Sequence, residues 1–253
     1  HIPTGPAANR VEINGIAYIP AGPGPHPTVV LCHGLPGNEK SLDLAQAMRR
    51  AGWTVIAFNY RGSWGSPGDY RFAQNLEDAS AVLAFARDPA NAAKLRIDPK
   101  RLGVMGHSMG GWVTALTAAK DRDILGAAMI SAANLGAFAK APRDQLAAGM
   151  KENGQEALAG TSPEIMADEL IANAAAFDWS KDATALAATN LFILSSDDGL
   201  APGTDALAEA IRKDGGGAKL KTLHVATDHS WSDARIRLQA EILGWLETLK
   251  AGK

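Results

Sequence analysis

Six apolar runs, each long enough for one strand, recur along the chain and are separated by segments with helical patterning. The runs are nearly continuous rather than alternating, which is typical of parallel strands buried on both faces of a sheet. Strand alternating with helix predicts an α/β fold, with a mostly parallel, doubly wound sheet of about eight strands. The runs lie at residues 28–32, 54–58, 102–105, 126–131, 191–195 and 220–225.

The segments between these runs place apolar residues on one face of a helix. We expect the clearest helices over 76–87, 204–214 and 232–250, the last packed against the sheet. Ahead of the first parallel strand, residues 10–19 predict a hairpin of two short strands. Its turn would fall at Asn14-Gly15, a pair that suits the positive φ angles of a tight turn.

One interval is too long for a single crossover helix. About 60 residues separate the strand that ends near Ser131 from the strand at 191. The interval is rich in alanine and has helix-like stretches at 142–150 and 163–176. We expect a small helical cap inserted at roughly 134–180 in a single domain that spans 1–253. The alternative is an ordinary crossover helix followed by a long loop.

The composition excludes several classes of protein. Of 253 residues, 46% are hydrophobic and 21% charged, which is ordinary for a soluble globular domain. A net charge of −2 without a basic block gives no reason to expect nucleic acid, and no apolar run reaches the roughly 18 residues of a membrane span. The chain begins at His1 with no signal-type segment, so we expect a trimmed N-terminus, with the compartment open and export possible.

The chain has a single cysteine, Cys32, inside an apolar run. One cysteine cannot form an internal disulfide, and no cysteine-based metal site can be built from it. A buried thiol in such a run is more often inert than reactive. We expect neither a metal nor a cofactor.

The run GVMGHSMGGW places Ser108 between Gly106 and Gly110, directly after a strand and before a helical pattern. This strand–turn–helix context is what a G-x-S-x-G nucleophile elbow requires. The glycines leave room for neighbouring backbone in the tight turn, and the helix N-terminus favours developing negative charge. Ser108 is therefore the candidate nucleophile, although a small residue in a tight turn would share the pattern.

A serine hydroxyl is a weak nucleophile and needs a base. Of six histidines, only His229 follows the last strand and precedes the terminal helix, at the sheet edge where an active site belongs. His33, before Gly34, is expected to shape its loop, and His107 is expected to face elsewhere on the elbow. The remaining three lie in the N-terminal region or within a strand: His1, His26 and His224.

Two further parts complete the candidate site. The loop SSDDGLAP after the strand at 191–195 offers Asp197 and Asp198 as the acid that orients the histidine. Adjacent residues on a loop point in different directions, so one can be the acid while the other caps a helix or meets solvent. The loop HGLPGN follows the first parallel strand, and it nominates the backbone N–H of Leu35, with that of Met109, as the oxyanion hole.

With these motifs in place, the chain resembles the α/β-hydrolase superfamily over nearly its whole length. HGLPGN is similar to the family's oxyanion loop, GHSMGG to its elbow and DHSWSD to its histidine loop. FNYRGSWGSPGD resembles a stretch of prolyl-oligopeptidase-like hydrolases and related bacterial esterases, in which Tyr60 and Arg61 would be structural. The family's acid pattern, G-x-x-D-x-x-V-P, matches SSDDGLAP in a register that selects Asp198, with serine in place of glycine and alanine in place of valine.

The resemblance implies a cofactor-free serine hydrolase that works through an acyl-enzyme. Serine at the elbow argues against epoxide hydrolase or dehalogenase chemistry, and against the cysteine of a typical dienelactone hydrolase. The leading hypothesis is hydrolysis of small-molecule carboxylic esters with small to medium acyl chains. The alternatives are a prolyl-oligopeptidase-like peptidase or amidase and a non-catalytic ligand-binding protein.

The walls of the substrate pocket are expected to come from the cap and the histidine loop. Four apolar residues there are candidates, although such side chains more often pack than recognise a ligand: Leu135, Phe138, Met166 and Trp231. The sequence alone leaves the natural ester and the oligomeric state open.

Overall fold

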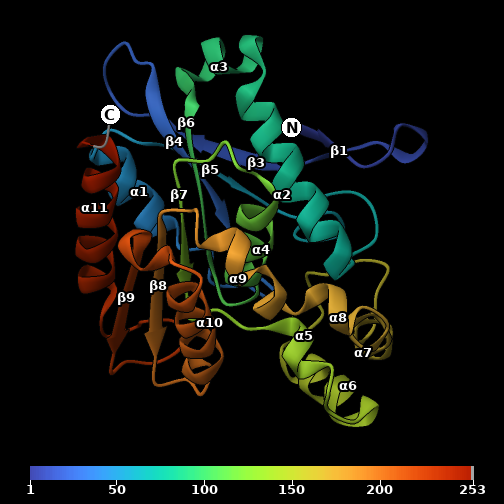
Figure 1. Ribbon diagram of the computed structural model, residues 1–253. Helices are drawn as coiled ribbons and strands as arrows, with labels where there is room; N and C mark the ends of the chain where they lie inside the picture. The colour runs from blue at the N-terminus through green and yellow to red at the C-terminus, as the bar shows by residue number, and fades with distance from the viewer. Residues whose placement is uncertain (252–253) are drawn as a thin grey trace.

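The protein, seen here as a computed structural model that describes residues 1–251, is built on a seven-stranded sheet with helices on both faces (Figure 1). The strand order is β3-β5-β4-β6-β7-β8-β9; β3 is antiparallel to β5, and every other neighbouring pair is parallel. The predicted α/β fold is confirmed, with seven strands in this sheet where about eight were expected. The strands are β3 (Gly15–Tyr18), β4 (His26–Cys32), β5 (Thr54–Phe58), β6 (Ile97–His107), β7 (Gly126–Ile130), β8 (Leu191–Ser196) and β9 (Leu220–Val225).

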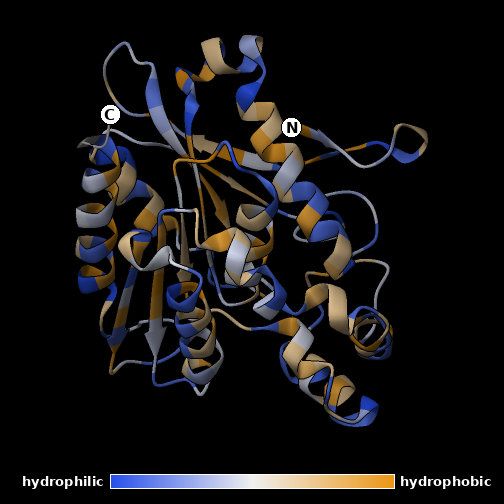
Figure 2. Ribbon diagram, in the orientation of Figure 1, coloured by the Kyte–Doolittle hydropathy of each residue, from blue (hydrophilic) through white to orange (hydrophobic). Residues whose placement is uncertain are grey.

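The central strands form the core because helices cover both of their faces. All residues of β5, β7 and β8 are buried, and Figure 2 shows the central strands as the most hydrophobic part of the chain. The edge strand β9 differs from the expectation, since only its last residue, Val225, is buried. A strand with one neighbour has less protein around it, so an apolar run is not sufficient evidence of burial on both faces.

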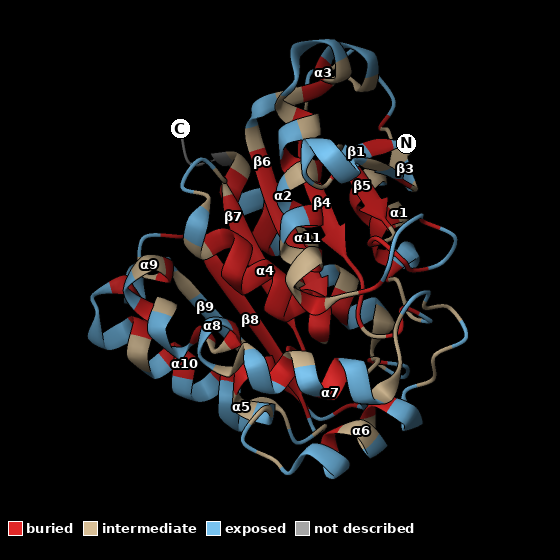
Figure 3. Cartoon of the chain, turned by 90° about the vertical axis from the view of Figure 1, so that its right-hand side faces the viewer, coloured by how far each residue is buried: buried red, intermediate tan, exposed pale blue. Residues whose placement is uncertain are grey.

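The helices divide between the two faces of the sheet. Apolar residues of α1 and α11 pack with one set of strand side chains, and those of α2, α4 and α10 pack with the other. Ten of the twelve residues of α4 are buried, so this helix is a core element. Figure 3 shows α4 coloured mostly as buried. The helices that flank the sheet are α1 (Leu42–Arg50), α2 (Phe72–Arg87), α3 (Pro89–Leu95), α4 (Met109–Lys120), α10 (Ala201–Lys213) and α11 (Arg235–Ala251).

The predicted N-terminal hairpin is wrong, although its two strands exist. The segment β2 (Val11–Ile13) pairs with β1 (Ile2–Thr4) in a separate two-stranded sheet, whereas β3 joins the edge of the main sheet through β5. A 3-10 turn, η1 (Ala7–Asn9), connects β1 to β2. Between β2 and β3, the backbone N–H of Asn14 donates to Ser66 Oγ at 3.0 Å. Asn14 is therefore held by a distant loop and does not turn the chain back on itself.

The long interval after β7 is helical. The helices α5 to α8 gather beside the end of the sheet toward which the β8 and β9 arrows point, whereas α9 lies beside α4 (Figure 1). The helix-like stretches predicted at 142–150 and 163–176 correspond to α6 and to α7 with α8. The elements of this insertion are α5 (Leu135–Phe138), α6 (Arg143–Glu152), α7 (Pro163–Ala172), α8 (Ala174–Phe177), the 3-10 turn η2 (Trp179–Asp182) and α9 (Ala183–Leu186); a further turn, η3 (Gly216–Lys219), precedes β9.

Backbone hydrogen bonds fasten this insertion to the loop between β5 and α2. The N–H of Trp64 donates to the Ala157 carbonyl at 2.8 Å, and the N–H of Ala159 donates to the Gly62 carbonyl at 2.7 Å. The Glu169 carboxylate of α7 also accepts both N–H groups at the start of α2. No helix within residues 1–251 combines the length and apolar character that crossing a membrane requires.

Candidate active site

Ser108 occupies the junction between β6 and α4 in a strained backbone conformation. Its φ and ψ are 58° and −122°, a combination that non-glycine residues rarely adopt and that clusters at functional sites. The backbone is held there because the N–H of Ser108 donates to the Ile130 carbonyl of β7 at 2.9 Å. The geometry is that of the elbow the sequence predicted, with the hydroxyl at the carboxyl edge of the sheet.

The two glycines of the elbow are sterically required. A Cβ atom on Gly106 would lie 2.2 Å from the Gly110 carbonyl oxygen, and one on Gly110 would lie 2.2 Å from the Cys32 carbonyl oxygen. Both distances are far inside van der Waals contact. Any side chain at either position would push α4 away from β4 and β6, and Ser108 would move with it.

Asp198 and His229 form the central hydrogen bond of the site. His229 Nδ1 lies 2.7 Å from Asp198 Oδ2, and the Asp198 side chain is 4% exposed against 39% for His229. Burial raises the pKa of Asp198, but hydrogen bonds from His229, the Leu200 N–H and Ser196 outweigh it and hold the pKa below its usual value. An ionised Asp198 accepts the Nδ1 proton and leaves His229 Nε2 as the nitrogen available for proton transfer.

The neighbouring carboxylate serves a different histidine. Asp197 Oδ1 lies 2.9 Å from His224 Nε2, whose other ring nitrogen lies 2.9 Å from Ser195 Oγ. The pair is exposed, at 51% for His224 and 62% for Asp197. Of the two aspartates left open by the loop sequence, the structure therefore brings Asp198 to His229.

His107 contacts His229 directly, contrary to the expectation that it would face elsewhere. Its Nε2 lies 2.7 Å from the His229 carbonyl oxygen, and the two ring centroids are 4.6 Å apart. Burial, and then the nearby His229, lower the pKa of His107 to about 4. The ring is neutral at pH 7, with Nε2–H donating to that carbonyl, so the residue next to Ser108 holds the backbone of the histidine loop.

Within residues 1–251, no hydrogen bond joins Ser108 Oγ to His229. Contacts between a nucleophile and its base are often long without substrate and shorten when substrate binds. The contact between His107 and His229 nevertheless keeps the histidine beside the elbow. The arrangement unites a strained serine, a hydrogen-bonded imidazole and a buried carboxylate at one edge of the sheet.

The two proposed oxyanion donors belong to the elbow itself, at Met109, and to the loop after β4, at Leu35. A Cβ atom on Gly34 would lie 3.1 Å from Ser108 Cβ, so the loop that carries Leu35 passes directly against the serine. Neither the Leu35 N–H nor the Met109 N–H donates a hydrogen bond within the described part of the chain. The Met109 side chain points into the core, where its sulfur accepts from the Tyr70 hydroxyl at 3.0 Å.

His33 is buried behind this loop. Its Nδ1 lies 2.7 Å from the Gly34 carbonyl oxygen, and its ring contacts Tyr60 at a centroid distance of 4.6 Å. Burial lowers the pKa of His33 to about 4, so the neutral ring donates Nδ1–H to Gly34. These contacts fit a residue that shapes the loop, as the sequence predicted, rather than a base.

Tyr60 and Arg61 belong to the framework of the fold. The Tyr60 hydroxyl donates to the His33 carbonyl at 3.2 Å, and Arg61 Nε pairs with the buried carboxylate of Asp78 at 2.7 Å. Asp78 also accepts the Thr4 hydroxyl, so this ion pair ties β1, the loop after β5 and α2 together. Burial raises the pKa of Asp78, and the bonds donated by Arg61 and Thr4 oppose that rise.

The predicted pocket residues do not form one wall. Met166 and Trp231 are 0% exposed and belong to the apolar cores on opposite faces of the sheet, so their assignment to a pocket wall is wrong. Leu135 is 4% exposed and packs mainly inside the insertion, whereas Phe138 is 38% exposed. The sequence could not separate packing from recognition here because both use apolar side chains.

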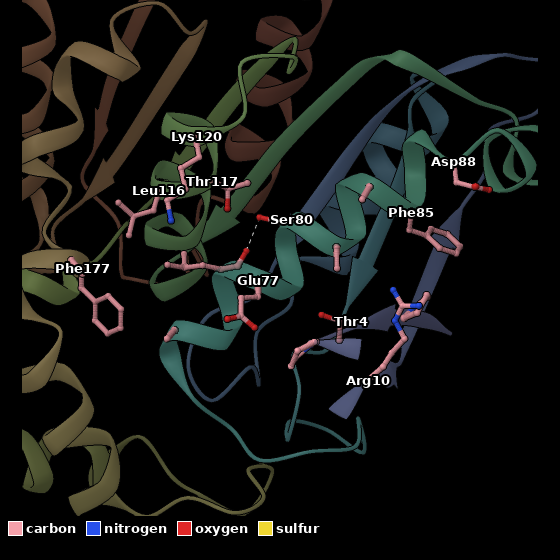
Figure 4. A pocket seen from close by; sticks show the side chains of 18 of the residues that line it. Thr4, Arg10, Glu77, Ser80, Phe85, Asp88, Leu116, Thr117, Lys120 and Phe177 are labelled. Atoms are coloured by element: carbon pink, nitrogen blue, oxygen red, sulfur yellow. Dashed lines mark hydrogen bonds between the residues drawn. The ribbon is translucent and has the colours of Figure 1, made fainter. Parts of the chain in front are cut away.

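Two cavities differ in their relation to the elbow. One of about 660 Å³ lies between the oxyanion loop at Pro36, the half-exposed Trp64 and the insertion at Leu158. Another, of about 930 Å³, lies between the N-terminal strands, α2 and α4 (Figure 4). The labelled lining of the second cavity mixes Arg10, Glu77 and other side chains, with no residue of the candidate site among them. Only the first cavity is continuous with a loop that contacts Ser108.

The residues described contain no group of three or more His, Cys, Asp or Glu side chains arranged to hold a metal ion. Cys32 is buried and free, and burial raises its pKa to about 12. The thiol is therefore protonated at neutral pH and matches the inert role expected of it.

Sequence reasoning missed the polar groups that support the site. Ser196, at the end of β8, donates to Asp198, and Ser131, after β7, is hydrogen-bonded to Ser196. Their position in the sequence was the one feature that could have indicated this role. Each serine lies at the carboxyl end of a buried parallel strand, the edge of the sheet that carries Ser108. Serine at such positions is too common for the sequence alone to distinguish it.

Comparison with known proteins agrees with the fold. The model of the family described as "Alpha/beta hydrolase family" matches residues 29–245, most of the chain. The chain belongs to this family. Members share a fold and an arrangement of active-site loops, but they carry out many reactions, so membership alone does not assign a substrate.

Individual relatives match over shorter stretches. The quorum-quenching protein AidA of Acinetobacter baumannii is 33% identical over 130 residues, 49% of this chain and 40% of that protein. The cutinase est2 of Thermobifida alba is 32% identical over 111 residues, 44% of this chain and 36% of the cutinase. The chain thus spans about two fifths of the length of these relatives. The crystal structure of 2,6-dihydroxy-pseudo-oxynicotine hydrolase covers 96% of this chain, and the chain covers 69% of it, with a TM-score of 0.70 at 21% identity.

Proposed function

We propose that this protein is a serine hydrolase that cleaves carboxylic esters with small to medium acyl chains through an acyl-enzyme intermediate. The observation that carries the proposal is the 2.7 Å contact between His229 Nδ1 and the buried Asp198 carboxylate, beside a serine with a φ of 58°. A base oriented by a carboxylate next to a strained serine is the arrangement that activates a hydroxyl nucleophile.

In the proposed acylation, His229 acts first as a base and then as an acid. Ser108 Oγ attacks the ester carbonyl carbon while its proton passes to His229 Nε2, and the carbonyl oxygen becomes an oxyanion. The backbone N–H groups of Leu35 and Met109 stabilise that charge, and each such donor typically contributes about 3–4 kcal/mol in the transition state. The bond to the alcohol oxygen then breaks, and the imidazolium Nε2–H protonates the departing alkoxide.

Deacylation repeats the sequence with water. His229 Nε2 takes a proton from a water molecule, whose oxygen attacks the acyl carbon and regenerates the oxyanion. Collapse of this intermediate releases the carboxylic acid, and Ser108 recovers its proton from His229. Every step uses side chains and backbone of this chain together with water, so the proposed reaction requires no cofactor.

We also propose that residues 134–180 act as a small cap over the substrate in a single domain spanning 1–253. The backbone bonds between Trp64, Ala157 and neighbouring residues support this role, because they fix the insertion beside the oxyanion loop. The 660 Å³ cavity between that loop, Trp64 and Leu158 is large enough for a small or medium acyl or alcohol group. Similarity to a cutinase supports ester substrates in general.

The test is hydrolysis of p-nitrophenyl esters from acetate to palmitate, with Ser108→Ala as the control. We expect turnover of the short and medium esters, a fall toward palmitate, and loss of turnover in Ser108→Ala. Turnover of aminoacyl anilides but not of esters would contradict the proposal and favour a peptidase or amidase. A folded protein that cleaves neither would favour a ligand-binding role.

A further inference from the structure

A row of buried hydroxyl groups extends from the Asp198 carboxylate into the protein. Ser196 Oγ lies 3.0 Å from Asp198 Oδ2, and Ser131 Oγ lies 2.6 Å from Ser196 Oγ. The row ends at Trp231, whose indole Nε1 lies 2.9 Å from Ser131 Oγ. Four side chains from three separate segments, the end of β8, the end of β7 and the loop before α11, are thus linked in one unbranched chain.

The chemistry of the two ends fixes the direction of every proton. The indole N–H of Trp231 can only donate, and an ionised carboxylate can only accept. Ser196 must therefore direct its single proton to Asp198, and Ser131 must direct its own to Ser196. Each hydroxyl accepts one hydrogen bond and donates one. The three bonds therefore run in one direction, from Trp231 through the two serines to Asp198 Oδ2.

The row lies in the protein interior. Trp231 is 0% exposed, and Ser131 and Ser196 are each 1% exposed. Hydrogen bonds in such a low-dielectric region are stronger than in water, and bonds aligned in series polarise one another. Because both hydroxyls are buried and bonded at each end, their alignment is part of the folded state.

The backbone of two members is strained in order to place them. Ser131 has a φ of 44° and Trp231 a φ of 59°, values that side chains other than glycine rarely adopt. Each is held by a backbone bond: Ser131 N–H donates to Leu194, and Trp231 N–H donates to Asp228. Strain of this kind, held by surrounding structure, is characteristic of groups whose position matters for function.

We propose that Ser196, Ser131 and Trp231 are positioning residues that hold the Asp198 carboxylate in the orientation it needs to bind His229. Asp198 Oδ2 is shared between Ser196 and His229, while Oδ1 accepts the Leu200 N–H at 2.9 Å. The three bonds leave the carboxylate a single orientation. The catalytic consequence rests on the proposed serine hydrolase function, whereas the positioning of His229 by this row does not.

The test compares Ser196→Ala, Ser131→Gly and Trp231→Phe with the wild type. Ser131→Gly removes the hydroxyl and tolerates the positive φ, and Trp231→Phe retains an aromatic ring without the N–H. The first readout is the proton NMR resonance of His229 Nδ1–H in the resting protein. The second is kcat and KM for p-nitrophenyl acetate.

We expect Ser196→Ala to have the largest effect because it removes the bond made to Asp198 itself. Without that donor, the carboxylate is held less firmly toward His229, so the hydrogen bond between Asp198 and His229 weakens and the Nδ1–H resonance moves upfield. The freed carboxylate also loses its orientation, and kcat falls about tenfold to a hundredfold with KM unchanged. Ser131→Gly and Trp231→Phe are expected to move both readouts in the same direction by progressively smaller amounts.

Trp53→Phe is the matched control. Trp53 is also 0% exposed and lies in the same apolar core as Trp231, but its indole N–H has no hydrogen-bond partner within the described residues. Its replacement removes a similar volume and no bond, so both readouts should match the wild type. Equal changes in Trp53→Phe and Trp231→Phe would overturn the proposal and assign the effect to core packing.

An unchanged resonance and unchanged kcat in folded Ser196→Ala would also overturn it. The NMR readout needs no substrate, which separates this inference from the proposed function. A wild type that cleaves no ester would contradict the function, and the order of the NMR shifts would then decide the positioning role by itself.

Discussion

Asp197 and Asp198 are adjacent in the chain, and each bonds a different histidine. Asp198 is buried against His229, whereas Asp197 pairs with His224 in solvent. We expect Asp198→Asn to lower kcat/KM about a thousandfold to ten-thousandfold, because the amide can stabilise the wrong tautomer of His229 and cannot offset the imidazolium charge. The measurement is ester hydrolysis at neutral pH.

Asp197→Asn is the matched control, with the same chemical change one residue away. It should leave kcat/KM within about twofold of the wild type, because the hydrogen bond between Asp197 and His224 is exposed and does not involve His229. The reverse ranking of the two variants would assign the role of acid to Asp197.

Single residues could be predicted where position along the chain limited the choice. Ser108 was identified by its glycines, and His229 was the only histidine in the loop after the last strand. The aspartate needed the structure, because neighbouring loop residues share a sequence environment but not a direction. Trp231 was misassigned because a large apolar residue near the histidine suggests a pocket, whereas its indole N–H serves a buried hydrogen bond.

At the scale of elements, the Arg61–Asp78 ion pair joins β1, the loop after β5 and α2. The Asp78 side chain is 0% exposed and that of Arg61 is 7% exposed. We expect Arg61→Met to lower the free energy of unfolding by about 3 kcal/mol, since it leaves a buried carboxylate without its counter-charge. Asp78 still accepts hydrogen bonds from the Thr4 hydroxyl and the Arg61 backbone N–H, which limits the loss of stability. Urea denaturation at pH 7 measures the change.

Arg143→Met provides the comparison, because it also removes an arginine that pairs with an aspartate. Arg143 and its partner Asp168 lie on the insertion and are half exposed. Its removal should not shift the urea midpoint measurably, because solvent screens the pair. Equal midpoints for the two variants would show that the buried pair does not fasten these elements.

Helices and strands could be predicted where the spacing of apolar residues determines the type of element. The pairing of strands was harder to predict, because it depends on partners that are distant in the sequence. The central strands and the helices of the insertion lie close to their expected residues. The N-terminal hairpin was mispredicted because Asn14-Gly15 permits a tight turn but does not enforce one. Distant partners, the Ser66 hydroxyl and the strand β5, decide where β2 and β3 go.

Two buried neutral histidines, His33 and His107, make the free energy of unfolding of the protein depend on pH. Burial lowers the pKa of both His33 and His107 from 6.5 to about 4. Between these values the unfolded chain binds more protons than the folded one, so stability falls as the pH drops from 6.5 to 4. Each histidine contributes about 3 kcal/mol to this loss.

Urea titrations at pH 7.0, 5.5 and 4.5 measure this dependence. We expect a stepwise decrease in the free energy of unfolding, and a smaller slope in the double variant His33→Asn, His107→Gln, whose amides carry no titratable proton. A stability that stays constant from pH 7.0 to 4.5 would contradict the assignment of buried, neutral rings.

Ser108 is the proposed nucleophile, and covalent labelling tests this role without any choice of substrate. The wild type and Ser108→Ala are incubated with a fluorophosphonate, and the adduct is measured by intact mass and mapped by peptide analysis. We predict one adduct on the wild type, on the peptide that contains Ser108, and none on Ser108→Ala. A folded wild type that takes no label, or a label on Ser195 beside His224 and Asp197, would contradict it.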